Sequence, residues 1–197
     1  MPKKRRSFTR PPGERRIRKL FVIAAEGAVT EPGYFDLFNN QRAVIQVNCL
    51  KNRDKSSPLQ VLTRMKRYLK EEDLKHPDEA WLVVDKDRWT DEQLTQLLDW
   101  SKKAENYGFA LSNPKFEYWL LLHFEDGAGV ASSRECSNRL KKHLPGYDKR
   151  FEAGKISIEM VEEAIRRARG RGNPSGATWP TTFGSTVYRL VESILRA

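Results

Sequence analysis

The sequence predicts an α/β fold with a mainly parallel sheet of about four strands, flanked by helices and followed by a C-terminal helical region. Two observations predict this fold class. Up to residue 131, short apolar runs alternate with segments of helical periodicity, an order typical of parallel strands joined by right-handed crossovers. After residue 131 the segments are helical in pattern. We therefore expect a basic flexible arm over residues 1–18, an α/β core over 19–131 and a helical region over 132–197 that packs on the core.

Four segments are expected to form the strands. Two of them are continuous apolar runs that end on an acid, which is typical of strands buried on both faces of a parallel sheet. Another alternates β-branched and polar residues. In chain order, the segments are 18–26 (RKLFVIAAE), 43–50 (AVIQVNCL), 79–87 (EAWLVVDKD) and 109–114 (FALSNP).

Helices are expected between and after these strands. Thr30 can cap a helix that has Glu31 and Pro32 in its first turn. The next helical segment begins with Ser-Ser-Pro, and the third is a capped amphipathic helix that is expected to stop at Gly108. No strand is expected between the last three segments. The helical segments are 30–41, 56–75, 90–108, 115–125, 132–145, 157–170 and 185–197.

The positive charge of the chain is concentrated at its start. Of a net charge of +10, residues 1–19 hold nine Lys or Arg and one Glu, while the rest of the chain is nearly balanced. Such an arm is suited to sequence-independent contact with a phosphate backbone, and the alternatives are a solubilising tail or an import signal. The residues expected to contact nucleic acid there are Lys3, Lys4, Arg5, Arg6, Arg10, Arg15 and Arg16.

A second basic cluster follows in the segment IRRARGRG, with Arg166, Arg167, Arg169 and Arg171. These side chains could also hold a nucleic-acid backbone. Equally, they could be the solvated face of a helix near its C-terminus, where cations are favoured in any case.

Several classes of protein are disfavoured. The longest apolar stretch is far too short to span a bilayer or to form the core of a secretory signal, so we expect a cytoplasmic protein without membrane association. The sequence contains no Walker A motif, no GxGxxG and no Ser/His/Asp arrangement. Cys49 and Cys136 show no metal or disulfide spacing and are expected to be packed thiols, and His123 is expected to be a core histidine.

Acidic residues follow two of the predicted strands. Glu26 ends the first and is followed by Gly27, whose missing side chain could let a phosphate or a metal-bound water approach; Asp85 and Asp87 end the third. Ligands of parallel sheets bind at the carboxyl ends of the strands, and carboxylates suit Mg²⁺ or Mn²⁺. Singly, each acid could instead be a cap, a core ion pair or a turn residue. Glu31 is a weaker candidate, because an acid in a first helical turn is stabilised by the helix dipole alone.

Four motifs make the chain similar to the RloB family of bacterial proteins, whose fold is similar to the Toprim fold of topoisomerases, primases and related nucleases. The most specific is the third motif, which contains Ser112, Asn113, Pro114, Phe116, Glu117 and Trp119. The motifs are AAEGAVTEPGYF, WLVVDKDRW, LSNPKFEYWLLLHF and PTTFGSTVYRLVE. The resemblance implies a Toprim-like, Rossmann-like core.

The Toprim pattern has a glutamate after the first strand and a DxD after the third. By this resemblance, Glu26, Asp85 and Asp87 are the catalytic and metal-linked acids, with Mg²⁺ or Mn²⁺ as cofactor. Glu31 and Glu117 belong to the RloB-type motifs and are possible additional acids. Family members are associated with anti-phage loci, often near an ATPase partner.

These observations lead to one expected function and two alternatives. The expected function is a metal-dependent nuclease that hydrolyses phosphodiester bonds of RNA or DNA in anti-phage defence, under the control of a partner. The first alternative is a non-catalytic subunit of a defence complex that binds nucleic acid or docks a partner. The second is an enzyme for a small phosphorylated ligand, against which the charged arm argues.

Overall fold

The computed structural model describes residues 18–41, 44–51, 57–87, 89–148, 153–171 and 178–197. Its centre is a five-stranded sheet with the strand order β2-β1-β3-β4-β5. The first four strands are parallel to their neighbours and β5 is antiparallel to β4. Their bounds are β1 Lys19–Ala25, β2 Ile45–Cys49, β3 Glu79–Asp85, β4 Tyr107–Asn113 and β5 Gly184–Ser185. The predicted α/β class with a mainly parallel sheet is confirmed.

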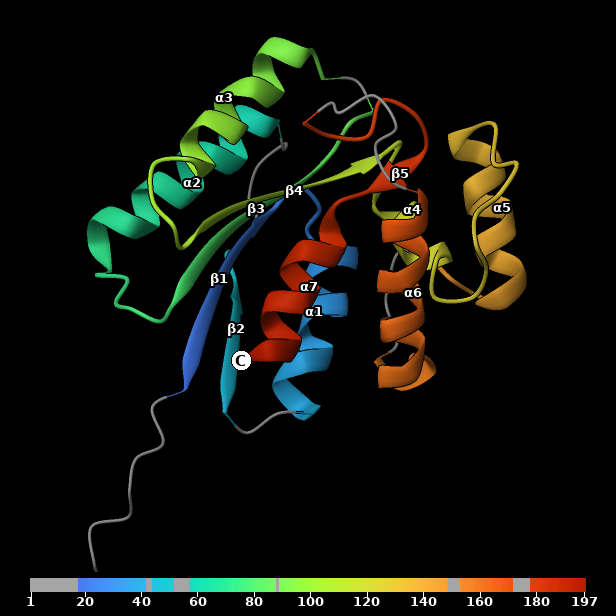
Figure 1. The fold of residues 1–197 in the computed structure, drawn as a ribbon, viewed down its shortest axis with the longest axis horizontal. Helices are drawn as coiled ribbons and strands as arrows, with labels where there is room; N and C mark the ends of the chain where they lie inside the picture. Colours follow the sequence, from blue (N-terminus) through green and yellow to red (C-terminus); the bar gives the residue numbers. More distant parts are fainter. Residues whose placement is uncertain (1–17, 42–43, 52–56, 88, 149–152, 172–177) are drawn as a thin grey trace, which may run out of the picture.

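Helices cover both faces of the sheet (Figure 1). The helices α2 (Pro58–Glu71) and α3 (Asp91–Ser101) lie on one face. The other face carries α1 (Thr30–Gln41), α4 (Phe116–Leu121), α5 (Ser133–His143), α6 (Ile158–Arg171) and α7 (Val187–Arg196), with a short 3₁₀ turn at Ala153–Lys155. None of the helices in these ranges is long and apolar enough to cross a membrane.

The continuous apolar run of β1 follows from this two-sided cover. Phe21 and Ile23 belong to the hydrophobic cluster on the α1 side, whereas Val22 and Ala24 belong to the cluster on the α2 side. Because successive side chains of a strand point to opposite faces, a strand covered on both sides needs an apolar residue at every position.

The starts of α2 and α3 follow the expected capping chemistry. The side chain of Ser57 accepts a hydrogen bond from the backbone N–H of Gln60, and Gln60 in turn accepts one from Ser57. Thr90 and Gln93 form the same reciprocal pair at the start of α3. Each pair satisfies backbone donors that a helix start leaves without a partner.

The predicted role of Gly108 as a helix stop is wrong. Helix α3 already ends at Ser101, and Gly108 is the second residue of β4. A Cβ atom at Gly108 would lie 2.3 Å from the Trp81 ring. The glycine is therefore required by the close approach of an aromatic side chain from the neighbouring strand.

The expectation that no strand occurs after residue 131 is also wrong. Gly184 and Ser185 form β5, which pairs with Asn113 and Ser112 at the end of β4. Thr186 extends this contact, because its backbone N–H and its hydroxyl group both bond to Leu111 of β4. A strand of two residues is too short to show any periodicity in the sequence, which is why the pattern of the C-terminal region missed it.

Candidate functional site

The carboxyl ends of β1 and β3 bring the predicted acids Glu26 and Asp85 together. Glu26 directly follows β1, and its backbone N–H donates to the carbonyl of Val83 in β3 at 2.9 Å. Asp85 is the last residue of β3, and its backbone N–H donates to the Glu26 carboxylate at 3.2 Å. The parallel pairing of the two strands thus produces the juxtaposition that the sequence predicted.

The Glu26 carboxylate is half-buried and held in place by two donors. Besides the Asp85 backbone, the indole N–H of Trp89 donates to both of its oxygens, at 3.1 and 3.2 Å. Burial raises the pKa of Glu26 to about 7, and the negative charges of Glu31 and Asp87 add to this increase. A carboxyl group that titrates near neutral pH can give or take a proton in the physiological range.

Glu31, in the first turn of α1, is closer to the centre of this site than its sequence position suggested. Its residue is only 5% exposed, and its carboxylate accepts a hydrogen bond from the backbone N–H of Gly27 at 2.9 Å. A Cβ atom at Gly27 would lie 2.0 Å from this carboxylate. A side chain at Gly27 would therefore displace the Glu31 carboxylate, and the predicted approach of a ligand at this glycine stays a prediction.

Asp85 interacts electrostatically with the other acids of the site. The backbone N–H of Phe116, at the start of α4, bonds to its carboxylate and lowers its pKa. Burial and the negative charges of Glu31, Glu26 and Glu117 outweigh that bond and raise the pKa well above the usual range. Four carboxylates, one each from the end of β1, α1, β3 and α4, thus form one group, which we call the acidic cluster: Glu26, Glu31, Asp85 and Glu117.

Asp87 lies at the margin of the acidic cluster. It is exposed, and its backbone N–H donates at 3.1 Å to the carbonyl of Pro114, the residue that follows β4. Asp85 and Asp87 therefore differ in environment, with Asp85 half-buried among the other acids and Asp87 toward solvent.

The donor set of the acidic cluster fits a hard divalent cation, because such ions take carboxylate oxygens as ligands. A cation would also relieve the repulsion that raises the pKa values of Glu26 and Asp85. Within the described ranges, however, no three Asp, Glu, His or Cys side chains already form a group that could hold a metal. Glu26 and Glu31 are instead directed at N–H donors of the chain.

Three further residues at the site were missed by the sequence reasoning. The guanidinium group of Arg64, from α2, donates to the carbonyl of Ala25 next to Glu26. Trp89 holds the Glu26 carboxylate, as described above. The hydroxyl group of Tyr147 lies 3.4 Å from the Thr30 hydroxyl and hydrogen-bonds with Glu117; burial and the charge of Glu117 raise its pKa.

The signal for these three residues in the sequence is uneven. Trp89 lies only two residues after Asp87 and was part of the quoted motif WLVVDKDRW, so it could have been included. Tyr147 follows α5 in a loop, and Arg64 is one of several basic residues of α2. The local sequence around these two residues gives no sign that they belong to the site.

A family model described as RloB-like protein matches residues 21–194. The chain belongs to the RloB-like family. The match spans all residues of the acidic cluster and Asp87, and it ends within the last turn of α7. Searches of curated proteins and of solved structures returned no match.

The basic residues of this RloB-like chain divide into two groups. Those predicted to bind nucleic acid in the arm, from Lys3 to Arg16, lie outside the described residues. Arg166 and Arg167 both pair with Glu163, and Arg169 pairs with Glu192 at 2.6 Å. Arg167 also donates to the backbone carbonyl of Leu122.

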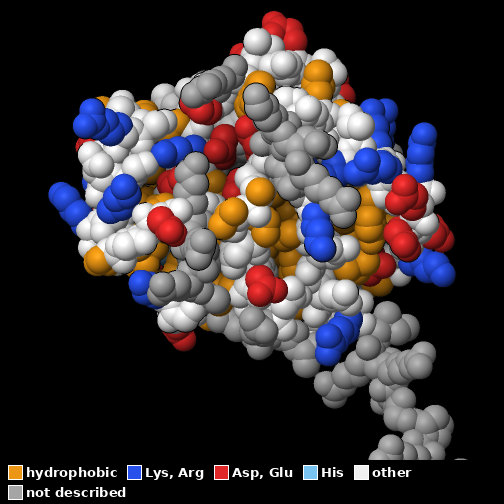
Figure 2. All heavy atoms as spheres, turned by 180° about the vertical axis from the view of Figure 1, so that it is seen from behind, with side chains coloured by type: hydrophobic (Ala, Val, Ile, Leu, Met, Phe, Trp, Pro, Cys, Tyr) orange, Lys and Arg blue, Asp and Glu red, His pale blue; other side chains and the backbone are white. Residues whose placement is uncertain are grey.

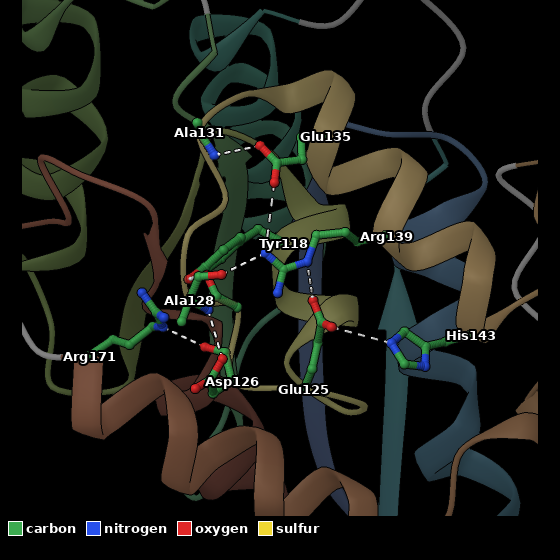
Figure 3. Close-up of polar contacts among 10 residues, drawn as sticks. Tyr118, Glu125, Asp126, Ala128, Ala131, Glu135, Arg139, His143 and Arg171 are labelled. Carbon is green, nitrogen blue, oxygen red and sulfur yellow. Dashed lines mark hydrogen bonds and ion pairs between the residues drawn. The ribbon is translucent and has the colours of Figure 1, made fainter.

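The fourth member of the second cluster, Arg171, helps to hold the loop after α4. Its guanidinium group donates to the carbonyl of Asp126, close to the ion pair between Arg139 and Glu125 (Figure 3). On the face shown in Figure 2, Lys and Arg side chains are scattered among acidic ones. All four arginines thus have structural contacts, and their contact with nucleic acid stays a prediction.

The histidine and cysteine predictions are confirmed. His123 is buried, its Nε2 atom lies 3.0 Å from the Tyr34 hydroxyl, and burial lowers its pKa to about 4. It is therefore a neutral residue of the core. Cys49 and Cys136 are free thiols, half-buried and buried respectively.

Proposed function

We propose that this RloB-like protein is a metal-dependent nuclease that hydrolyses phosphodiester bonds of RNA or DNA in anti-phage defence. Its activity is controlled by a partner, for which an ATPase of the same locus is a candidate. The observation that carries the proposal is the acidic cluster at the carboxyl ends of β1 and β3, the edge at which parallel sheets bind their ligands.

The residues that would hold a metal are Asp85 and Asp87, with Glu26 beside them and Glu31 and Glu117 as further acids. A bound Mg²⁺ or Mn²⁺ ion supplies charge neutralisation at the phosphate and lowers the pKa of a bound water. The carboxylates of the acidic cluster repel one another, and a bound cation would reduce this repulsion.

Glu26 is the proposed proton carrier. With a pKa of about 7, its carboxyl group is present in both protonation states near neutral pH. It can accept the proton of an attacking water or give a proton to the leaving oxygen of the nucleic-acid strand. The backbone N–H of Asp85 and the indole N–H of Trp89 hold the Glu26 carboxylate in one orientation.

Affinity for the substrate is assigned to the basic arm. Residues 1–19 carry nine of the basic side chains of the chain, whereas the described arginines of α6 are held by contacts within the fold. The arm therefore contributes sequence-independent, salt-sensitive attraction to phosphates.

The alternative is a non-catalytic subunit that binds nucleic acid or docks a partner. The observation that favours it is that, in the described residues, no three acidic, His or Cys side chains form a ready-made metal site. In this case the acidic cluster contributes to regulation or structure, and binding of nucleic acid is independent of divalent ions.

The test is cleavage of labelled tRNA, single-stranded RNA and plasmid by the full chain, with and without Mg²⁺ or Mn²⁺. Glu26→Gln and Asp85→Asn remove one charge each from the acidic cluster. Glu105→Gln makes the same chemical change at an exposed position after α3 and serves as the matched control. Binding of Mn²⁺, followed by electron paramagnetic resonance, reports on the metal without relying on cleavage.

The nuclease proposal predicts cleavage that requires metal and is lost in Glu26→Gln and Asp85→Asn but kept in Glu105→Gln. Salt-sensitive binding without cleavage, together with unchanged Mn²⁺ binding in Asp85→Asn, supports the binding subunit instead. Cleavage that survives both substitutions overturns the assignment of the acidic cluster.

A further inference from the structure

A second cavity lies away from the acidic cluster, at the outer edge of the sheet. Its volume is about 220 Å³, and its walls come from β3, the end of α3, the first half of β4, α7 and the segment before β5. Four of the lining residues are aromatic and one is a cation. These five residues are Trp81, Tyr107, Phe109, Trp179 and Arg189.

The cavity exists because β5 is so short. β5 pairs only with Ser112 and Asn113, so within the described residues no strand pairs with the outer edge of β4 from Tyr107 to Ala110. Because Gly108 has no side chain, the Trp81 ring of the neighbouring strand can lie against this edge.

The aromatic walls are held in fixed orientations. The Trp81 indole N–H donates to Glu79 at 2.7 Å, and Glu79 is itself bonded to Lys19 and Ser193. On the other side, the Tyr107 ring stacks on Trp100 with a centroid distance of 4.5 Å. The rings of Phe109 and Trp179 meet edge to face at 6.4 Å. Rings positioned in this way offer flat surfaces for a planar ligand.

Arg189 supplies positive charge at the rim. It is exposed on α7, and its side chain contacts Tyr188, with the guanidinium carbon 5.8 Å from the ring centroid. Unlike Arg166 and Arg169, it has no carboxylate partner among the described residues. A cation beside aromatic walls suits a ligand that joins a planar ring to an anion.

We propose that this cavity binds one base of a single-stranded segment of nucleic acid, stacked against Trp179, with the adjoining phosphate at Arg189. This inference rests on the proposed function, since it takes the ligand to be a nucleic acid. The volume of about 220 Å³ is below that of pockets for drug-sized ligands, about 300–1,000 Å³, which favours one ring system. A base can enter only if it is unpaired, so the cavity favours single strands over duplexes.

The cavity is suitably placed for a strand that also reaches the acidic cluster. Gly108 and Ser112 are four residues apart on β4, and Ser112 pairs with Asp85. At about 3.3 Å per residue of a strand, the base would lie roughly 13 Å from Asp85 along the sheet. The bound base and the reacting phosphate would thus belong to neighbouring parts of one strand.

The test is binding of a fluorescently labelled hexanucleotide to the full chain in EDTA, where metal-dependent cleavage is absent. Arg189→Gln changes an exposed residue and leaves the core intact, and it should weaken binding about tenfold. Trp179→Leu should weaken it by about 5- to 150-fold, the range for loss of one stacked base. Arg196→Gln, which removes an exposed charge from the same helix, is the matched control and should have little effect.

A duplex of the same sequence should show no difference between wild type and Arg189→Gln. A probe that carries 5-iodouracil should photo-cross-link to Trp179 or Trp81, which locates the base directly. Unchanged affinity in Arg189→Gln, or cross-links confined to other regions, overturns the proposal. These results are also expected if the open edge of β4 binds a peptide strand and not a nucleic acid.

The two proposals fail in distinguishable ways. If cleavage depends on Glu26 while Arg189→Gln binds the hexanucleotide like wild type, the nuclease proposal stands and the base cavity is wrong. If Arg189→Gln and Trp179→Leu weaken binding while no metal supports cleavage, the base cavity stands and the nuclease proposal is wrong.

Discussion

Replacement of Glu26 by Gln should stabilise the protein at high pH, even though it removes the proposed proton carrier. The pKa of Glu26 is raised from 4.5 to about 7 in the folded state. Between these values the folded state binds more protons than the unfolded state, so the free energy of unfolding falls as pH rises. Glu26→Gln cannot ionise and is free of this loss.

The size of the effect follows from the change in pKa. At 1.36 kcal/mol per pH unit, the rise of Glu26 corresponds to about 3.4 kcal/mol. Because the carboxylate is only half-buried, solvent screens part of the interaction, and we expect about 2 kcal/mol. The relevant quantity is the stability difference between variant and wild type at about pH 8.5, minus the same difference at about pH 4. Costs that do not depend on pH, such as altered hydrogen bonds to Trp89, cancel in this comparison.

The assay is urea unfolding followed by circular dichroism across this pH range, in EDTA, for wild type, Glu26→Gln and the exposed control Glu105→Gln. The double difference should be about 2 kcal/mol for Glu26→Gln and close to zero for the control. Addition of Mg²⁺ should reduce it, because a bound cation removes part of the penalty in wild type. A double difference close to zero for Glu26→Gln would show that this carboxyl group ionises with an ordinary pKa. It would refute the electrostatic reasoning for the acidic cluster.

Three other predictions concern parts of the chain that can be changed separately. Gly27→Ala should displace the Glu31 carboxylate from its backbone donor and lower the free energy of unfolding by about 1–3 kcal/mol in urea titrations; unchanged stability would contradict the close contact. Gly108→Ala should force the Trp81 ring away and cost about 1–3 kcal/mol, visible as a lower Tm and altered near-UV circular dichroism. Removal of residues 1–16 should flatten the slope of log affinity against log salt by about 0.7–0.9 for each lost phosphate contact, and an equal slope would exclude the arm from binding.

The sheet and the pairing of Glu26 with Asp85 were predictable because they depend on local patterns and one general rule. Apolar runs of strand length mark β1 and β3, and parallel strands place their carboxyl ends at one edge. The sequence did not give the strand order, however, and the two acids meet because β1 and β3 are neighbours in the sheet. The same argument could not extend to Glu31, whose burial depends on how α1 turns back against Gly27.

The remaining features depend on contacts between distant segments, which a single sequence does not encode locally. β5 joins the sheet through Thr186 and Leu111, which are 75 positions apart. Arg169 resembles a free surface charge in the sequence, yet it pairs with Glu192 of another helix. The sequence of the basic cluster in α6 fitted both nucleic-acid contact and a solvated helix face. Charge alone does not reveal which side chains already have partners in the fold.

The acidic cluster is the place where local consistency breaks down, and that is its strongest link to function. Elsewhere the chain pairs its partly buried charges, as with Lys19 and Glu79 at the opposite end of the sheet. At the acidic cluster, burial and neighbouring negative charges instead raise the pKa values of Glu26 and Asp85. Natural sequences keep such unfavourable arrangements mainly at functional sites, because selection for stability alone would remove them. Protons or a divalent cation can relieve this repulsion, and the Mg²⁺ dependence of the Glu26→Gln experiment separates the two.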